Sequence, residues 1–470
     1  MSVTGTESGI ETNVAEFLQA CAARWPSGQA RPRVLARAPG RLDCMGGMAD
    51  YSGALALQMP IERAAHVAVG RRDDQRIEVH ALGFSQAGQK PSHSWPLALF
   101  YQSDGQFITA QRLAAAMSEA PWAVHVAGVC LALLESGEVP HFAGGFTLVL
   151  HSDVPSGAGL AASAAIQVAV AKALVGLFEV EPDVATLLRI CRSAGSNGTP
   201  AGLVDHAACL LGEADTLLQI RCPGDEPVGR LPLPRDVTFA AVDVGMRLPI
   251  YPRRYEDNRV SCLMGRYLIE RMIRAGENGQ EPGIESLAGI TPSEYVRRFR
   301  NELPVKIRGR DFVSLYGQPP ELEGELEPHQ VYKVRSRTEH HIYENERTHR
   351  FLERLARARR TGERDALVEA GELMYASHWS YGQRCGMGSI ETDVLVNAVR
   401  ARGPARGLYG AKVTAGGCGG SVAVLMADSP TARAALQEAR DAYAQKTGRQ
   451  ATILIGSSPG AAVFGQRHLD

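Results

Sequence analysis

The chain alternates between short segments with the two-residue period of strands and longer segments of helical composition. Residues 14–25 predict a helix behind a polar tail, and residues 33–41 predict a strand that runs into a Pro-Gly turn. Alternation on both sides of an Asp-rich turn predicts a hairpin over 66–82. A strand predicted at 145–153 leads into a glycine-rich loop, and a helical stretch without a breaker follows at 161–178. In this order, strand, loop and helix, a glycine-rich turn can carry a function.

A different pattern of hydrophobic and polar residues starts near residue 235. A strand is predicted at 237–245, and a long amphipathic helix at 253–273. Residues 275–334 are rich in Gly, Pro and Glu, and we interpret them as an insertion between helices. Two helices are predicted next, and their charged residues are typical of solvated helix faces. Residues 407–427 predict strand, glycine-rich turn and strand, and residues 451–465 predict a closing strand and loop.

Composition excludes several classes of protein. The chain has 470 residues, enough for two or three domains, with 45% hydrophobic and 21% charged residues. Its net charge of −1 argues against a nucleic-acid or membrane-surface partner. There is no apolar run of the ~20 residues that a membrane span needs, and no secretory signal pattern at the start. Nine scattered cysteines without a CxxC pair fit reduced thiols. We therefore expect a cytoplasmic protein without nucleic-acid or membrane partners.

The segment VPSGAGLAASAA, residues 154–165, has the composition of a phosphate-binding loop. Gly157 and Gly159 allow the backbone to approach an anion closely, and the unpaired N–H groups of a following helix would favour one. Ser156 and Ser163 add hydroxyl groups, and the hydroxyl of Ser163 could contact a metal ion. The alternative is a helix entrance that needs glycines for its bend alone.

Two further segments combine small residues with polar ones. TAGGCGGS, residues 414–421, leaves backbone uncovered between two predicted strands, although a tight hairpin or bulge would do the same. APGRLDCMGGMADYSG, residues 38–53, places Arg41, Asp43, Asp50 and Tyr51 where a strand end would otherwise be apolar. Arg41 could offset charge on a phosphoryl group, and Asp50 could accept hydrogen bonds from two sugar hydroxyls. The alternative is a surface turn with a structural Arg–Asp pair.

In order and spacing, these three segments resemble the signature motifs of the GHMP small-molecule kinases, in their galactokinase branch. Residues 38–53 are similar to A-P-G-R-x-N-x-I-G-E-H-x-D-Y, residues 154–165 to P-x-G-x-G-L-S-S-S-A, and the segment at 414–421 to M-T-G-G-G-F-G-G. The similarity covers nearly the whole chain from about Val34. Within the branch the sequence most resembles the kinase domains of L-arabinokinases, for example in its central insertion with the exit YENER.

The resemblance implies an α+β fold of two domains with the active site in the cleft between them. Residues 1–30 would be an N-terminal extension, 31–234 the N-terminal kinase domain, and 235–470 the C-terminal domain with the insertion at 275–334. It also implies an ATP-dependent sugar 1-kinase that uses Mg²⁺ and acts as a monomer or homodimer. The γ-phosphate of ATP would go to the anomeric hydroxyl of a monosaccharide, L-arabinose first and galactose second.

Residue roles follow from the same resemblance. Asp205 would take the proton of the sugar hydroxyl, and Arg41 would steady that carboxylate and the developing charge. Tyr255 would line the sugar pocket, and Ser163 would contact the metal. The substrate residues implied are Gly47, Asp50, Tyr51, Tyr255, Gly416 and Gly417, and the nucleotide residues are Pro155, Gly157, Ala158, Gly159, Leu160, Ala162 and Ser163.

One departure from the galactokinase pattern bears on the substrate. Galactokinases have Glu-His where this chain has Gly47-Met48, and that pair helps to hold the hydroxymethyl group of galactose. L-Arabinopyranose has the same arrangement of ring hydroxyls without that carbon. Loss of the polar pair while Asp50 stays predicts a preference for L-arabinose.

Other departures concern the metal. Ala161 and Ala162 replace two of three loop serines, Gln167 replaces a common Glu, and the segment before Asp205 lacks a Glu that helps to hold magnesium. Ser163, ATP oxygens and water would then make a weaker site. The alternatives are a weak or inactive sugar- and ATP-binding relative, and a kinase of another small molecule. For a uronic acid, Arg63 or Arg253 would have to supply a cation. His340, His341 and His378 are predicted to be structural.

Overall fold

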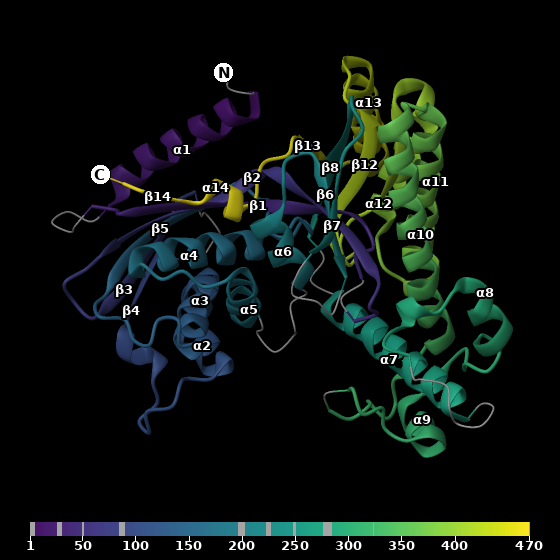
Figure 1. The fold of residues 1–470 in the computed structure, drawn as a ribbon, viewed down its shortest axis with the longest axis horizontal. Helices are drawn as coiled ribbons and strands as arrows, with labels where there is room; N and C mark the ends of the chain where they lie inside the picture. Colours follow the sequence, from purple (N-terminus) through teal and green to yellow (C-terminus); the bar gives the residue numbers. More distant parts are fainter. Residues whose placement is uncertain are drawn as a thin grey trace.

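The computed structural model describes residues 5–25, 31–48, 51–83, 90–195, 203–221, 227–247, 251–275, 284–322 and 324–469. Two mixed layers of sheet and helix make up most of this part of the chain (Figure 1). The eight-stranded sheet has the order β14-β1-β2-β5-β3-β4, with β6 paired to β2 and β7 paired to β6. Its strands are β1 (Val34–Met45), β2 (Leu55–Arg71), β3 (Arg76–Ala81), β4 (Ser92–Pro96), β5 (Phe146–Ser152), β6 (Thr216–Arg221), β7 (Pro227–Pro232) and β14 (Gln466–His468).

Helices cover both faces of this sheet. On one face lies α1 (Gly5–Arg24), which turns a stripe of Ile10, Val14, Phe17 and Cys21 onto the strands. The spacing of these residues is that of one helix face, so the helix predicted at 14–25 is confirmed and begins earlier. The opposite face carries α2 (Ala110–Ala116), α3 (Val124–Glu135), α4 (Ala162–Phe178), α5 (Val184–Gly195) and α6 (Leu203–Leu211).

The second sheet has the order β11-β12-β8-β13, from β8 (Val237–Arg247), β11 (Leu408–Val413), β12 (Gly419–Ala427) and β13 (Thr452–Ile455). Strand β12 is buried on both faces: Val422 and Val424 pack towards α12 (Ile390–Arg402) and α13 (Pro430–Thr447), while Ala423 and Leu425 face the larger core. The strand, glycine-rich turn and strand predicted for 407–427 are confirmed as β11, a turn and β12, and the two strands pair antiparallel as a hairpin, which was the alternative for the glycine segment. Helices α10 (Val334–Thr361) and α11 (Arg364–Ser380) pack side by side against this layer.

The segment interpreted as an insertion has structure of its own after residue 283. It contains α8 (Pro292–Glu294), the π-helix η5 (Tyr295–Phe299), α9 (Gly309–Tyr316) and the short pair β9 (Ile307–Arg308) and β10 (Val331–Tyr332). These elements share an apolar cluster with α7 (Tyr251–Ala275), the long helix predicted at 253–273. The last strand, β14, returns to pair with β1 of the first sheet. The domain division at 234–235 stays a prediction.

Two local predictions were wrong. The hairpin over 66–82 does not form, because β5 lies between β2 and β3, antiparallel to the first and parallel to the second. Alternation identified the strands but carries no information about their partners. The Pro-Gly turn is also absent: β1 runs through Pro39 and Gly40, with a register shift between Pro39 and Arg41. A bulge absorbs the missing N–H of the proline.

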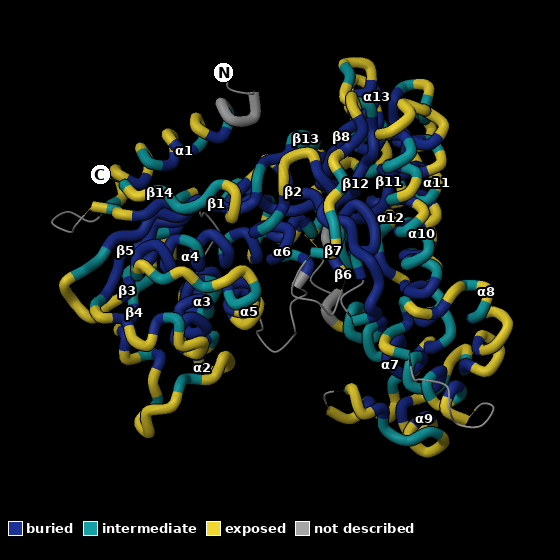
Figure 2. Tube along the Cα trace, viewed as in Figure 1, coloured by how far each residue is buried: buried dark blue, intermediate teal, exposed yellow. Residues whose placement is uncertain are grey.

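The strand, glycine loop and helix predicted for 145–178 are confirmed as β5, the loop 153–161 and α4. Central strands such as β1, β2 and β11 and the inner faces of the helices are largely buried, whereas exposed residues follow the outer turns and edge strands (Figure 2). Among the helices in the described ranges, none is both long and apolar enough to cross a membrane.

One apolar cluster joins the two layers. It runs from α4 and the first sheet to Phe239 of β8 and Phe351 of α10, whose ring centroids are 6.5 Å apart. Phe351 is fully buried. Because this core is shared, we expect the two layers to lose stability together.

We therefore predict that Phe351→Ala destabilises the whole molecule by about 3–5 kcal/mol, the usual effect of removing a buried phenyl ring. Urea unfolding followed by circular dichroism should show one transition at a lower midpoint. The exposed Val463→Ala is the control, and its midpoint should stay within error of the wild type. Two separate transitions in Phe351→Ala would contradict the shared core.

Candidate active site

Arg41 lies where β1 crosses the glycine-rich loop. Its backbone N–H donates to the carbonyl of Leu160 at 3.0 Å, and its Nη1 donates to the carbonyl of Gly159 at 2.6 Å. The side chain is only 5% exposed. The loop and the arginine are therefore fixed relative to each other by both backbone and side chain.

The same guanidinium binds Asp205, the third residue of α6. Nε and Nη2 of Arg41 donate to Oδ1 of Asp205 at 2.9 and 2.7 Å. The aspartate side chain is 38% exposed, so one side of it faces solvent. Burial alone would lower the pKa of Arg41, but the charges of Asp205 and Asp43 outweigh it and raise that pKa. The arginine thus stays charged, and neither bond uses Oδ2 of Asp205.

The loop before α4 has the backbone of an anion cradle. Gly157 and Gly159 have φ values of +67° and +81°, and Ala161, directly before the helix, has a φ of +60°. Left-handed backbone at a non-glycine residue is strained and tends to persist where function requires it. Ala158 and Leu160 are fully buried and anchor the loop in the core. Ser163 is exposed in the first turn of α4.

Gln167, which replaces a common glutamate, is committed to the core. Its Oε1 lies 2.8 Å from Nε2 of His206, and its Nε2 lies 3.3 Å from Nδ1 of His125. Gln167 is 1% exposed. The amide ties together α3, α4 and α6, and so it supports the residue next to Asp205. It is not available as a metal ligand in this arrangement.

The predicted sugar-side residues gather around the turn between β11 and β12. The ring of Tyr255 packs so closely on Gly416 that a Cβ there would lie 3.0 Å from its Cε2. Gly417 packs on the ring of Tyr381, where a Cβ would lie 3.1 Å from Cδ1. Tyr51 meets Tyr255 edge to face, with ring centroids 5.9 Å apart. The structure therefore brings Tyr51, Tyr255 and both glycines together.

Tyr51 itself points inward. Its ring contacts His341 of α10 at a centroid distance of 4.9 Å, and its buried hydroxyl has no hydrogen-bond partner among the described residues. Burial raises the pKa of this phenol well above its usual value. Its predicted contact with substrate stays a prediction, as does that of Asp50, which lies outside the described residues.

The glycine at position 47 has a packing reason. A Cβ there would lie 2.1 Å from Oδ2 of Asp43 and 2.3 Å from the carbonyl of Ala415. Met48 is 1% exposed in an apolar cluster with Tyr381. No side chain fits at 47, and an imidazole at 48 would be buried among apolar groups. The pair Gly47-Met48 is thus part of how this loop packs.

Sequence reasoning assigned no role to Arg247, at the end of β8. Its Cδ would lie 3.0 Å from a Cβ at Gly157, so its side chain lies beside the phosphate loop. Asp243 holds the guanidinium through two bonds of 2.9 and 2.8 Å. A cation from the second sheet therefore stands next to a loop of the first. A single arginine in a strand gives no signal of this in the sequence.

The histidines expected to be structural pack behind the sugar-side residues, where His341 contacts Tyr51 and His340 contacts Tyr381. His340 and His341 are buried in α10, and burial lowers the pKa of His341 to about 3. His378 accepts from the backbone N–H of Val413 at 3.2 Å. Over the described ranges, no three His, Cys, Asp or Glu side chains come together as a metal site.

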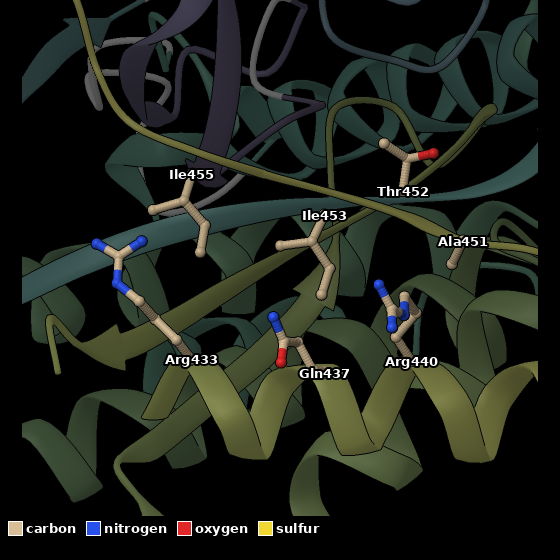
Figure 3. Close-up of a pocket in the computed structure, with 7 residues that line it drawn as sticks. All are labelled: Arg433, Gln437, Arg440, Ala451, Thr452, Ile453 and Ile455. Atoms are coloured by element: carbon tan, nitrogen blue, oxygen red, sulfur yellow. The ribbon is translucent and has the colours of Figure 1, made fainter. Parts of the chain in front are cut away.

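A separate hollow of about 450 Å³ lies between α13 and β13 (Figure 3). Its arginines, Arg433 and Arg440, already pair with Asp428 and Asp441. None of the predicted site residues lines it.

Two family models match the parts of the chain that contain Arg41, the phosphate loop and Asp205. The GHMP kinases N terminal domain matches residues 125–213, and the galactokinase galactose-binding signature matches residues 27–71. The L-arabinokinase of Arabidopsis thaliana is 32% identical over 484 residues, which span 92% of this chain and 46% of that protein. This chain therefore corresponds to about half the length of the plant enzyme.

The galactokinase of Chloroflexus aurantiacus is 28% identical, over 90% of this chain and 91% of that protein. Among solved structures, Lactococcus lactis galactokinase complexed with galactose superposes with a TM-score of 0.72 at 19% identity. That match covers 97% of this chain and 100% of the other. At this level of identity the likeness shows the fold.

The packing of Gly47 gives a prediction. Gly47→Ala should destabilise the protein by about 1–3 kcal/mol, because the new methyl group meets Asp43 and the backbone of Ala415. Thermal unfolding measures the effect. Gly289→Ala is the matched control, since nothing lies within 4 Å of a Cβ at that position. Equal melting temperatures for the two variants would refute the packing argument.

Proposed function

The chain belongs to the GHMP kinases, and we propose that it transfers the γ-phosphoryl group of ATP to the anomeric hydroxyl of a monosaccharide. The observation that carries the proposal is the position of Arg41. This guanidinium bonds at once the carbonyl of Gly159 in the phosphate loop and the carboxylate of Asp205. A base and a phosphate cradle joined by one buried cation suit phosphoryl transfer, which depends mainly on positioning and charge.

The proposed step uses Asp205 as the base. Oδ1 is held by Arg41, so Oδ2 accepts the proton of the sugar hydroxyl while that oxygen attacks the γ-phosphorus. The bond from the γ-phosphorus to the bridging oxygen breaks, ADP leaves, and the carboxyl group later returns its proton to solvent. Arg41 and Arg247 offset the negative charge that develops on the phosphoryl oxygens.

Magnesium would come with ATP. The donor set fits an ion that keeps most of its water: Ser163 offers one exposed hydroxyl, and Gln167 is bonded to histidines. Ser163 would therefore be the protein ligand, and the ion would supply charge neutralisation between the phosphates. Affinity for the free ion should be low.

L-Arabinose is the proposed acceptor and galactose the second choice. Support comes from Met48, whose thioether is buried in an apolar cluster with Tyr381, so that position 48 offers no polar partner to a hydroxymethyl group. The exclusion of any side chain at Gly47 removes a second partner. A pentopyranose lacks this hydroxymethyl group and loses no hydrogen bond, whereas a hexose leaves a hydroxyl unsatisfied.

A panel of acceptors tests the function. Purified protein with ATP and magnesium should release ADP with L-arabinose, more slowly with galactose, and not with galacturonate. One unsatisfied hydroxyl corresponds to a loss of about 10-fold or more in kcat/KM. Equal or better turnover of galactose would refute the preference. If ADP is released with none of the three sugars at several magnesium concentrations, the proposed acceptors are wrong, and the two alternatives stand: an inactive, ligand-binding relative and a kinase of another small molecule.

The base is tested by Asp205→Asn. We expect kcat to fall by about 10²–10⁴-fold, because the amide retains the shape but cannot take a proton. Asp73→Asn, in the exposed turn between β2 and β3, is the matched control and should behave like the wild type. Retention of more than a tenth of the activity in Asp205→Asn would exclude this residue as the base.

A further inference from the structure

A second buried ion pair lies close to Arg41 and has no role in the proposed transfer. Nζ of Lys412, in β11, is 3.1 Å from Oδ2 of Asp43, in β1. The two side chains are 0% and 1% exposed. Oδ1 of the same carboxylate accepts from Nε2 of Gln58 at 2.9 Å. Each oxygen of the aspartate is therefore satisfied without water.

Burying such a pair is costly, and it rarely adds net stability compared with apolar residues of similar size. Burial raises the pKa of Asp43, against the charges of Lys412 and Arg41, which lower it. The ring of Tyr381 also lies 5.0 Å from Nζ of Lys412. The buried pair therefore fixes the relative position of Lys412 and Asp43, although the desolvation of both charges opposes folding.

What the pair defines is the junction between the two sheets. Strand β1 belongs to the first sheet and β11 to the second. Beside the ion pair, the hydroxyl of Thr414 donates to the carbonyl of Asp43 at 3.0 Å and accepts from its N–H at 3.1 Å. Thr414 is the first residue of the glycine segment 414–421. These contacts hold that segment against β1.

The pair also lies between Arg41 and the predicted sugar-side residues. Asp43 follows Arg41 by two residues, so both side chains leave the same face of β1. On its other side, Oδ2 of Asp43 would lie 2.1 Å from a Cβ at Gly47. Asp43 therefore sets how closely residues 46–48, which we call the sugar loop, can approach β1. A shift of Asp43 would therefore move the sugar loop and the glycine segment together.

We propose that Lys412 and Asp43 are positioning residues for the sugar, which set the sugar loop and the glycine segment at a fixed distance from Arg41. The inference rests on the proposed function. The phosphate loop does not depend on this pair, because Arg41 holds it through Gly159 and Leu160. Loss of the pair should consequently weaken binding of the sugar and leave binding of ATP unchanged.

Lys412→Met tests this expectation, since it keeps the length of the side chain and leaves Asp43 without its cation. The KM for the sugar should rise at least 10-fold, while the KM for ATP stays within about twofold of the wild type. The double variant Asp43→Asn with Lys412→Met removes both charges and should recover much of the sugar KM. A Lys412→Met enzyme with unchanged sugar KM, or with equal losses for both substrates, would overturn the proposal.

Arg37→Met is the matched control for a purely structural loss. Arg37 is fully buried in the same strand, but it bonds Glu62 and Ser458 away from the site. It should lower the melting temperature without changing the ratio of the two KM values. A similar rise in sugar KM in Arg37→Met would mean that any destabilised β1 gives the effect, which would also overturn the proposal.

Hydrogen–deuterium exchange separates this inference from the proposed function, because it needs no substrate. In Lys412→Met, amides of residues 41–48 and 413–418 should exchange faster than in the wild type, whereas amides of the phosphate loop should not. If no sugar is phosphorylated but these segments loosen as described, the positioning role survives and the proposed function fails. Unchanged exchange in both segments would refute the positioning role whatever the activity.

Discussion

The arrangement of the site depends on the donors of one buried guanidinium. Arg41 has almost no access to water, so its N–H groups must be satisfied by the protein. They are satisfied by the loop carbonyl of Gly159 and by the carboxylate of Asp205. β1, the phosphate loop and α6 come from three distant parts of the sequence, and this residue fixes their separation. An uncharged residue in its place would leave the carboxylate partly buried and unpaired.

Around this centre, close backbone contact replaces side chains. The sugar loop can approach Asp43 and Ala415 only because residue 47 has no Cβ. The ring of Tyr255 packs on Gly416 for the same reason. Two ion pairs lie next to these close backbone contacts. Asp43 pairs with Lys412 on the sugar side, and Asp243 pairs with Arg247 beside the phosphate loop. The two sheets are thus joined by a shared apolar core and by the Asp43–Lys412 pair, whereas Asp243 and Arg247 both belong to β8.

Much of this was predictable from sequence because the informative residues are consecutive. The strand, glycine loop and helix at 145–178 and the strand, turn and strand at 407–427 follow from local pattern alone. Partners distant in sequence did not follow: alternation placed β2 and β3 in one hairpin, yet β5 separates them. Assignment of Asp205 as partner of Arg41 came from the resemblance to kinases, and the structure places the two in contact.

The remaining features had no sequence signal. Lys412 and Arg247 are single cations within apolar strands, and only the folded arrangement places each beside an aspartate and a functional loop. Gln167 suggested a weakened metal site by its difference from a common glutamate. The structure gives it another use, as a link between His206 and His125. The replacement of glutamate by glutamine is visible in the sequence, but the two histidines that bond the glutamine are visible only in the structure.

The central claim is that Asp205, held by Arg41, activates an anomeric hydroxyl towards ATP. Phosphorus-coupled NMR of the product formed from ATP and L-arabinose tests it most directly. We expect one new phosphate ester, coupled to the anomeric proton of the sugar, and its loss in Asp205→Asn. A phosphate on any other carbon, or an undiminished yield from the Asn variant, would contradict it.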